Sequence, residues 1–239
     1  MNGTYPNETH LKPLVLGALC ANCYILPLDE PDPPDESLSG KAEEAPQPCA
    51  VIDPGGQAPL IIARMKKLNL SPRYILLTHG HFDHIAALPD LAEVFPQALI
   101  AIHRGDAAYL GKDAYTLHRE SFAAAGDPSC VDMLWKDMPC PSLLLEEGDE
   151  AGPFTMLHLP GHTPGSAGFY LQGKPEDQKL LFSGDTLFHD GYGRTDLPGG
   201  NWESLMQSLK RLLSMDGGVR VFPGHGPATT IEKETQRYK

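Results

Sequence analysis

The sequence predicts an α/β fold in which helices cover an open β-sheet. Across residues 49–103, short apolar runs typical of buried strands alternate with segments whose apolar residues have helical spacing. The 24 glycines and 23 prolines indicate many turns, which a helical bundle does not need. Hydrophobic residues make up 41% of the chain, enough for a sizeable core, so the composition excludes a globally disordered protein.

In the first half of the chain, predicted strands and helices follow one another in regular order. Strands or hairpins are expected at 14–28, 49–52, 74–78 and 98–103, and helices at 58–68 and 85–95. In the first helix, four apolar residues are spaced to share one buried face: Leu60, Ile61, Met65 and Leu68.

The second half begins irregularly and then becomes rich in strands. Short helices are expected at 106–110 and 114–125, where prolines at 128, 139 and 141 prevent longer elements. Beyond them we expect strands at 154–159, 165–171, 179–183 and 219–222, and helices at 202–213 and 230–238. In the helix at 202–213, one apolar stripe is expected to be buried: Trp202, Leu205, Leu209 and Leu212.

Residues 1–239 are expected to form a single domain with one solvated insertion at 29–48. This insertion holds seven acidic residues, one lysine and five prolines. Such a segment buries too little apolar surface to offset the entropy lost on ordering it. It carries half of the formal net charge of −12.

Composition also limits the partners and the cellular setting. An acidic chain repels phosphate backbones, so we expect no nucleic-acid partner. No run of 18 apolar residues predicts a transmembrane helix, so no membrane partner is expected. The five cysteines, an odd number spread along the chain, do not suit a disulfide framework and indicate a cytoplasmic protein. The sequence does not determine the oligomeric state.

The densest functional signal is a motif of three histidines and one aspartate where a predicted strand meets a helix. Residues 78–84 read Thr-His-Gly-His-Phe-Asp-His. Imidazole and carboxylate groups are good ligands for zinc and other first-row metals. Because alternate side chains of an extended segment point the same way, His79 and His81 can bind one ion. Asp83 and His84, at the start of the helix, can then bind a second.

Three later strand ends present further potential ligands. His162 lies in the turn L-P-G-H-T-P-G, Asp185 ends the strand L-F-S-G-D-T, and His225 lies in V-F-P-G-H-G-P. Each signal is weak alone, since a histidine in a turn is usually a surface residue. A metal site at an edge that all four strand ends share would explain them together.

In their order and spacing, these motifs resemble the metallo-β-lactamase superfamily, and within it the small glyoxalase II-like hydrolases. The resemblance spans residues 14–231 and includes Asp53-Pro54-Gly55-Gly56 and the segment 191–200. It implies a four-layer αββα sandwich with two metal ions in a groove at the edges of the sheets. The C-terminal helical domain with which larger glyoxalase II enzymes bind glutathione is not expected here.

The resemblance also implies which residues hold the ions. The implied ligands are His79, His81 and His162 for the first ion, Asp83, His84 and His225 for the second, and Asp185 as a bridge. Asp53 would orient a ligand from outside this set, or would only form the turn before Pro54. The expected cofactors are two divalent ions, with zinc first and iron or manganese as alternatives.

The implied activity is hydrolysis of a thioester such as S-lactoylglutathione by a metal-bridging hydroxide that Asp83 orients. The substrate is expected to be an anionic thiol conjugate, with Arg194 and Tyr192 as candidate binding residues. Arg194 could equally pair with Asp196 to brace its loop. The Gly-Tyr-Gly-Arg-Thr-Asp segment leaves a mononuclear-iron persulfide dioxygenase as the alternative. A lactonase and a non-catalytic protein of this fold are further alternatives.

Overall fold

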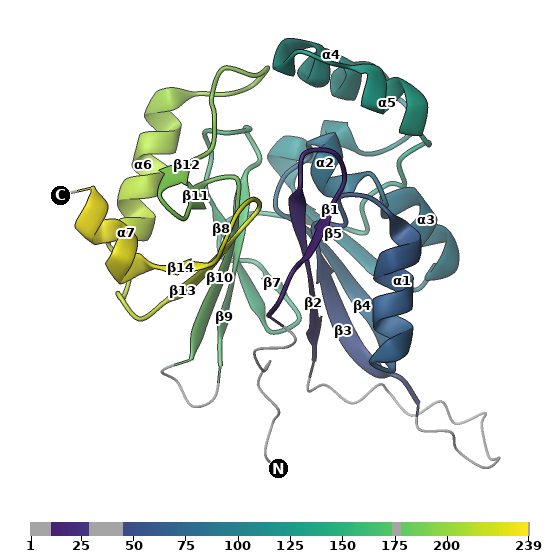
Figure 1. Cartoon of the computed structure of the whole chain (residues 1–239), viewed down its shortest axis with the longest axis horizontal. Coiled ribbons are helices and arrows are strands. Elements are labelled where there is room, and N and C mark those ends of the chain that lie inside the picture. Colours follow the sequence, from purple (N-terminus) through teal and green to yellow (C-terminus); the bar gives the residue numbers. More distant parts are fainter. Residues whose placement is uncertain (1–10, 29–44, 174–177, 239) are drawn as a thin grey trace.

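The structure, a computed structural model, describes residues 11–28, 45–173 and 178–238. Two six-stranded sheets pack face to face, and helices cover the outer side of each sheet (Figure 1). This arrangement confirms the predicted α/β class and the four-layer αββα sandwich. No helix in these three ranges is long and apolar enough to cross a membrane.

The first sheet combines an N-terminal hairpin with parallel strands. In spatial order its strands are β1 (Leu14–Leu16), β2 (Ala21–Pro27), β3 (Gln47–Ile52), β4 (Leu70–Leu77), β5 (Leu99–His103) and β6 (Leu143–Leu145). β1, β2 and β3 pair antiparallel, whereas β3 to β6 are mutually parallel. Helices α1 (Ala58–Lys67) and α3 (Leu88–Val94) lie on its outer side (Figure 1). Such helices are the usual crossovers between parallel strands.

The second sheet is mostly antiparallel and comes from the second half of the chain. Its strands, in spatial order, are β14 (Thr229–Thr230), β13 (Arg220–Pro223), β10 (Lys179–Gly184), β9 (Ala167–Gln172), β8 (Phe154–His158) and β7 (Glu150–Ala151). Helices α6 (Trp202–Leu213) and α7 (Ile231–Arg237) cover it, and β11 (Leu187–Phe188) pairs with β12 (Gly191–Tyr192) beside it.

Short helices lie at the end of the molecule where β3, β4 and β5 finish. They are α2 (Phe82–Ile85), the 3-10 helix η1 (Arg104–Tyr109), α4 (Tyr115–Ala125) and α5 (Ser129–Leu134). In Figure 1, α4 and α5 form the top of the molecule.

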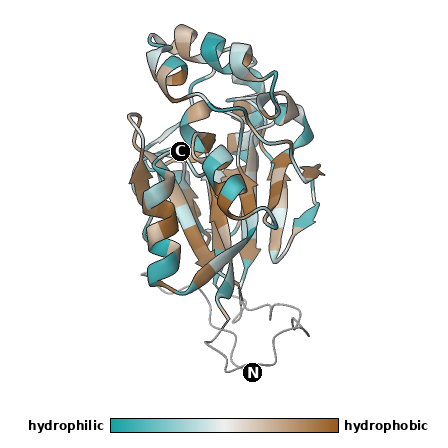
Figure 2. Ribbon diagram, turned by 90° about the vertical axis from the view of Figure 1, so that its right-hand side faces the viewer, coloured by the Kyte–Doolittle hydropathy of each residue, from teal (hydrophilic) through white to brown (hydrophobic). Residues whose placement is uncertain are grey.

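Three apolar layers hold the sandwich together, and the strands are its most hydrophobic segments (Figure 2). Ile61 and Met65 of α1 pack on the first sheet. Phe154 and Phe182 fill the space between the sheets, and Leu205 of α6 packs on the second sheet. All five side chains are at most 1% exposed. Each contributes about 1.5–3 kcal/mol by leaving water.

Several predicted boundaries need correction. The helix expected at 85–95 is two helices, because Pro89 lacks an N–H and is tolerated only in the first turn of α3. Most of the predicted insertion, 29–44, lies outside the described residues, but Gln47 and Pro48 belong to β3 and pair with β4. β4 begins at Leu70, earlier than expected. The short elements β6, β7, β11, β12, β14 and α5 were not predicted, since so few residues carry no periodic signal.

Two residues expected on buried helix faces are exposed instead. Leu60 is 52% exposed, because the buried face of α1 centres on Ile61 and Met65. Trp202 is 50% exposed although Leu205, Leu209 and Leu212 of the same helix are buried. Trp202 is the first residue of α6, and its ring packs against Tyr192 of β12 instead of the sheet.

Candidate metal centre

The predicted ligands converge because the elements that carry them finish at the same edge of the sandwich. β4 ends at Leu77, directly before the motif at 78–84. β10 and β13 are parallel neighbours that end at Gly184 and Pro223, so Asp185 and His225 follow at the same edge. The turn between β8 and β9 adds the fourth segment, which contains His162.

A first group consists of three buried histidines. The ligand atoms of His79, His81 and His162 all lie within 4.8 Å of one another. The closest pair is His81 Nδ1 and His162 Nε2, at 2.8 Å. Burial, followed by the neighbouring histidines, lowers the pKa of His79 and of His81 well below the ordinary value. Both rings are therefore neutral at pH 7, which is the form that binds a metal.

A second group lies beside it and includes a carboxylate. The ligand atoms of Asp83, His84 and His225 also lie within 4.8 Å of one another. His84 Nε2 is 3.2 Å from His225 Nε2, and Asp83 Oδ2 is 3.4 Å from the same His225 nitrogen. Burial opposes charge on His84, but Asp185 and Asp83 outweigh it and raise its pKa to about 10. These carboxylates favour positive charge at this point, whether it comes from a proton or a metal ion.

Asp185 lies between the two groups. Its Oδ1 is 3.4 Å from His84 Nε2, and its Oδ2 is 3.6 Å from His162 Nε2 and 3.5 Å from His225 Nε2. Within the described residues, the buried atoms Asp185 Oδ1 and His79 Nε2 have no hydrogen-bond partner. An unpartnered buried polar atom costs about 1–3 kcal/mol, which a bound cation would offset. The seven side chains therefore fit a pair of metal ions that share one carboxylate.

The outer ring nitrogens of three of these histidines are held by other groups. His84 Nδ1 donates to Asp53 Oδ2 at 3.1 Å, and His162 Nδ1 donates to the carbonyl of Arg194 at 2.7 Å. His79 Nδ1 lies 3.1 Å from Thr78 Oγ1. Such contacts hold a proton on Nδ1, so that Nε2 is the nitrogen available to a ligand; on His84 a metal ion would replace the Nε2 proton that the neighbouring carboxylates favour.

Asp53 links the two groups through hydrogen bonds with Thr78 and His84. Its carboxylate accepts hydrogen bonds from the backbone N–H of Thr78 at 2.8 Å and from the Thr78 hydroxyl at 2.6 Å, as well as from His84. Asp53, His79 and His84 also lie close enough to hold an ion together. Both oxygens of Asp53 are already engaged, however, so it suits an orienting role better than a ligand role.

Sequence reasoning missed Asp106, a fully buried carboxylate of η1. It accepts hydrogen bonds from Gly80 N at 2.9 Å, from the Thr163 hydroxyl at 2.7 Å and from Gly165 N at 2.7 Å. Burial raises its pKa, and these hydrogen bonds partly offset the effect. Asp106 thus ties the turn with His79 and His81 to the turn with His162. No local motif marks it, because its partners lie 26, 57 and 59 residues away.

The two groups open into a cavity of about 400 Å³, which we call the histidine groove. His81, Asp83, His162, Asp185 and His225 contribute its polar side, and Leu19, Phe122, Ala125, Phe188 and Leu197 its apolar side. Tyr192 and Arg194 also line it. The Arg194 guanidinium makes two hydrogen bonds of 2.7 Å to the Asp196 carboxylate. Of the two roles predicted for Arg194, the bracing contact is therefore formed in this structure.

Comparison with known proteins places this site in context. Residues 44–225 match the metallo-beta-lactamase superfamily. The hydroxyacylglutathione hydrolase GloC of Haemophilus influenzae is 34% identical over 187 residues, which cover 78% of this chain and 84% of that protein. The crystal structure of TTHA1623 in a di-iron-bound form is 35% identical with a TM-score of 0.72, covering 94% of this chain and 97% of that one. The B3 metallo-beta-lactamase BLEG-1 is 32% identical with a TM-score of 0.74, covering 94% and 96%.

Proposed function

The chain belongs to the metallo-β-lactamase superfamily, and from that premise we propose that it is a dinuclear metal hydrolase that cleaves acyl thioesters. The position of Asp185 carries the proposal, because its carboxylate lies within 3.4–3.6 Å of ring nitrogens from both groups of ligands. The di-iron form of the similar protein TTHA1623 supports two ions. We propose zinc as the first candidate, with iron or manganese as alternatives, since these ligands accept all three.

Each side chain has a definite role in this proposal. Bound divalent ions lower the pKa of coordinated water and polarise a carbonyl. We assign His79, His81 and His162 to one ion and Asp83, His84 and His225 to the other, with Asp185 between them. Burial opposes ionisation of Asp83, but His84 and the hydrogen bond with His225 hold its pKa well below the ordinary value. Asp83 is therefore ionised at neutral pH and can accept a hydrogen bond from the attacking nucleophile.

A thioester suits this groove because a thiolate leaves readily and no nucleophilic side chain is required. The similarity to the GloC hydrolase supports S-lactoylglutathione as the first substrate to test. Arg194 lines the groove and could bind the carboxylate of an anionic thiol conjugate when its contact with Asp196 opens. All five cysteines are free, which supports a cytoplasmic setting.

The test combines metal analysis with hydrolysis of S-lactoylglutathione and of other acyl thioesters. The wild-type protein should hold two ions per chain and hydrolyse at least one of these esters. His225→Ala should lose one ion and most of the activity. The control His189→Ala, at an exposed position beside the groove, should keep two ions and the wild-type activity. Unchanged metal content and rate in His225→Ala would exclude the dinuclear mechanism.

The same assays separate the alternative. A persulfide dioxygenase would need only one iron, and His79, His162 and Asp185 could supply its ligands without the second group. Oxygen uptake with glutathione persulfide at one iron per chain, without thioester hydrolysis, would replace our proposal with this one. A lactone and a β-lactam serve as further control substrates.

A further inference from the structure

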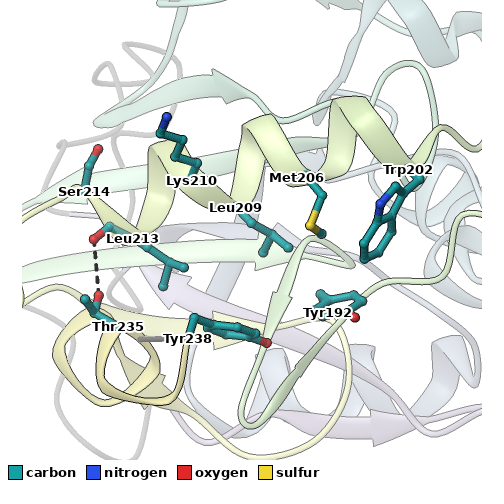
Figure 3. A pocket seen from close by; sticks show the side chains of 9 residues that line it. All are labelled: Tyr192, Trp202, Met206, Leu209, Lys210, Leu213, Ser214, Thr235 and Tyr238. Carbon is teal, nitrogen blue, oxygen red and sulfur yellow. Dashed lines mark hydrogen bonds between the residues drawn. The ribbon is translucent and has the colours of Figure 1, made fainter.

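A second cavity, of about 550 Å³, lies on the outer side of the second sheet between α6 and α7 (Figure 3). Its walls are mainly aromatic and aliphatic side chains: Tyr192, Trp202, Met206, Leu209, Leu213 and Tyr238. We call it the aromatic groove. Its volume lies within the range of about 300–1,000 Å³ that is usual for small-molecule sites.

Three large rings are exposed along this groove. Trp202, Tyr192 and Tyr238 are 50%, 41% and 43% exposed. The ring centroid of Tyr192 lies 5.5 Å from that of Trp202 and 6.2 Å from that of Tyr238, so the three form one patch. Contiguous exposed aromatic surface is unfavourable in water and commonly marks a site where an apolar group binds.

The groove offers little to a polar ligand. The hydroxyl of Ser214 donates to the carbonyl of Arg211. The hydroxyl of Thr235 donates to the carbonyl of Leu213 (Figure 3). The cationic group that reaches the cavity belongs to Lys210, and Figure 3 shows its ammonium pointing away from the rings. An occupant that left its polar groups unpaired against these walls would bind weakly. An alkyl or aryl group meets no such penalty.

Tyr192 lies between this cavity and the candidate metal centre. The same residue lines both the aromatic groove and the histidine groove. It lies on β12, one strand of the short hairpin whose other strand, β11, carries Phe188, and the Phe188 ring lies 6.1 Å from that of His225. The two grooves therefore adjoin at Tyr192, which is the residue that a substrate would have to pass to occupy both.

We propose that the aromatic groove binds an extended apolar acyl group of the substrate, so that the protein prefers thioesters of long alkyl or aryl acids. This inference rests on the proposed function, since it names the acyl class for the same reaction. Each CH₂ group that leaves water contributes about 0.8 kcal/mol, or up to about fourfold in kcat/KM. The value of kcat/KM for an octanoyl thioester should therefore be at least about tenfold above that for the acetyl thioester of the same thiol, even when only part of the chain is buried.

The first measurement is the ratio of kcat/KM for octanoyl and acetyl esters of one thiol, with the metal-loaded protein. Trp202→Ala and Tyr238→Ala should each reduce this ratio severalfold. Leu60→Ala removes a similarly exposed apolar side chain from α1, which covers the other sheet, and should leave the ratio unchanged. A ratio near one in the wild-type protein, or a high ratio that neither groove variant lowers, would overturn the inference.

The second measurement detects binding without turnover. The chain has two tryptophans, so Trp135→Phe leaves Trp202 as the only indole. Titration of this variant with decanoate should change its fluorescence saturably, and Tyr238→Ala should weaken the effect. No change would contradict an apolar site. An emission that depends on protein concentration would instead indicate that a second copy covers the groove, which would also contradict it.

The outcomes distinguish the inference from the proposed function. If no thioester of any chain length is hydrolysed by protein with two ions, the proposed function is wrong, whatever decanoate does. If short and long esters are hydrolysed equally, the function stands and the assignment of the groove is wrong. If the effect of the groove variants on kcat/KM depends on which thiol the ester carries and not on the length of the acyl chain, the groove binds the thiol carrier. The acyl assignment is then wrong.

Discussion

Asp106 offers the sharpest test of how this metal centre is built. Asp106→Ala would leave the buried backbone N–H groups of Gly80 and Gly165 without their carboxylate acceptor, while the Thr163 hydroxyl keeps its 2.8 Å contact with Ser166. Each unsatisfied buried donor costs about 1–3 kcal/mol. The desolvated carboxylate that is removed offsets part of this cost. We therefore expect the free energy of unfolding to fall by about 2–4 kcal/mol.

Asp106→Asn should separate positioning from folding. The amide has nearly the same shape as the carboxylate, but its NH₂ group cannot accept the hydrogen bonds that Gly80 and Gly165 donate. Either the turn with His79 and His81 or the turn with His162 must therefore shift. We expect weaker metal binding at the site of His79, His81 and His162, with little change at the site of His84 and His225. A chelator competition titration would measure the two affinities, and urea unfolding would measure stability.

The matched control is Asp149, an exposed aspartate whose carboxylate accepts a hydrogen bond from the backbone N–H of Glu146. Asp149→Ala should cost less than about 1 kcal/mol, because water replaces the lost acceptor. If Asp106→Asn bound both ions as tightly as wild type and Asp106→Ala were as stable as the Asp149 variant, the assigned role of Asp106 would be wrong.

Three further predictions concern the metal, pH and the groove. Chelation of the ions should lower Tm in calorimetry, since an ion at one hundred times its Kd stabilises the folded state by about 2.7 kcal/mol; an unchanged Tm would argue against a structural contribution. Burial lowers the pKa of His118 to about 4, so acid favours the unfolded state, which takes up the proton first. Between pH 6.5 and 4 the free energy of unfolding should fall by up to about 3 kcal/mol more in wild type than in His118→Phe, and parallel pH curves from urea unfolding would contradict this. Arg194→Ala should raise KM about tenfold for an anionic thioester and little for a neutral one. If KM changed equally for both esters, the only role left for Arg194 would be its contact with Asp196.

The long periodic elements were predictable, because their signal is local. The helix at 202–213 and the strands that precede the ligands follow from apolar spacing, and the structure places them within a few residues. Prediction failed where one residue breaks the periodicity. Pro89 divides one expected helix. β4 begins before Pro72 and continues past it, with a register shift in its pairing with β3 directly after this proline. Trp202 fits the stripe of its helix by spacing, yet tertiary packing turns it to β12.

By itself, the sequence determined which side chains are available to bind metal and that each follows the end of a strand. Imidazole and carboxylate chemistry and the local strand-to-turn pattern are written in adjacent residues such as His79 and His81. Only the tertiary structure decided how these ends meet, that Asp185 lies between the two groups, and that Asp106 ties their turns together. The reason is physical, since contacts across dozens of residues depend on how two sheets pack, and short sequence patterns carry no record of that packing.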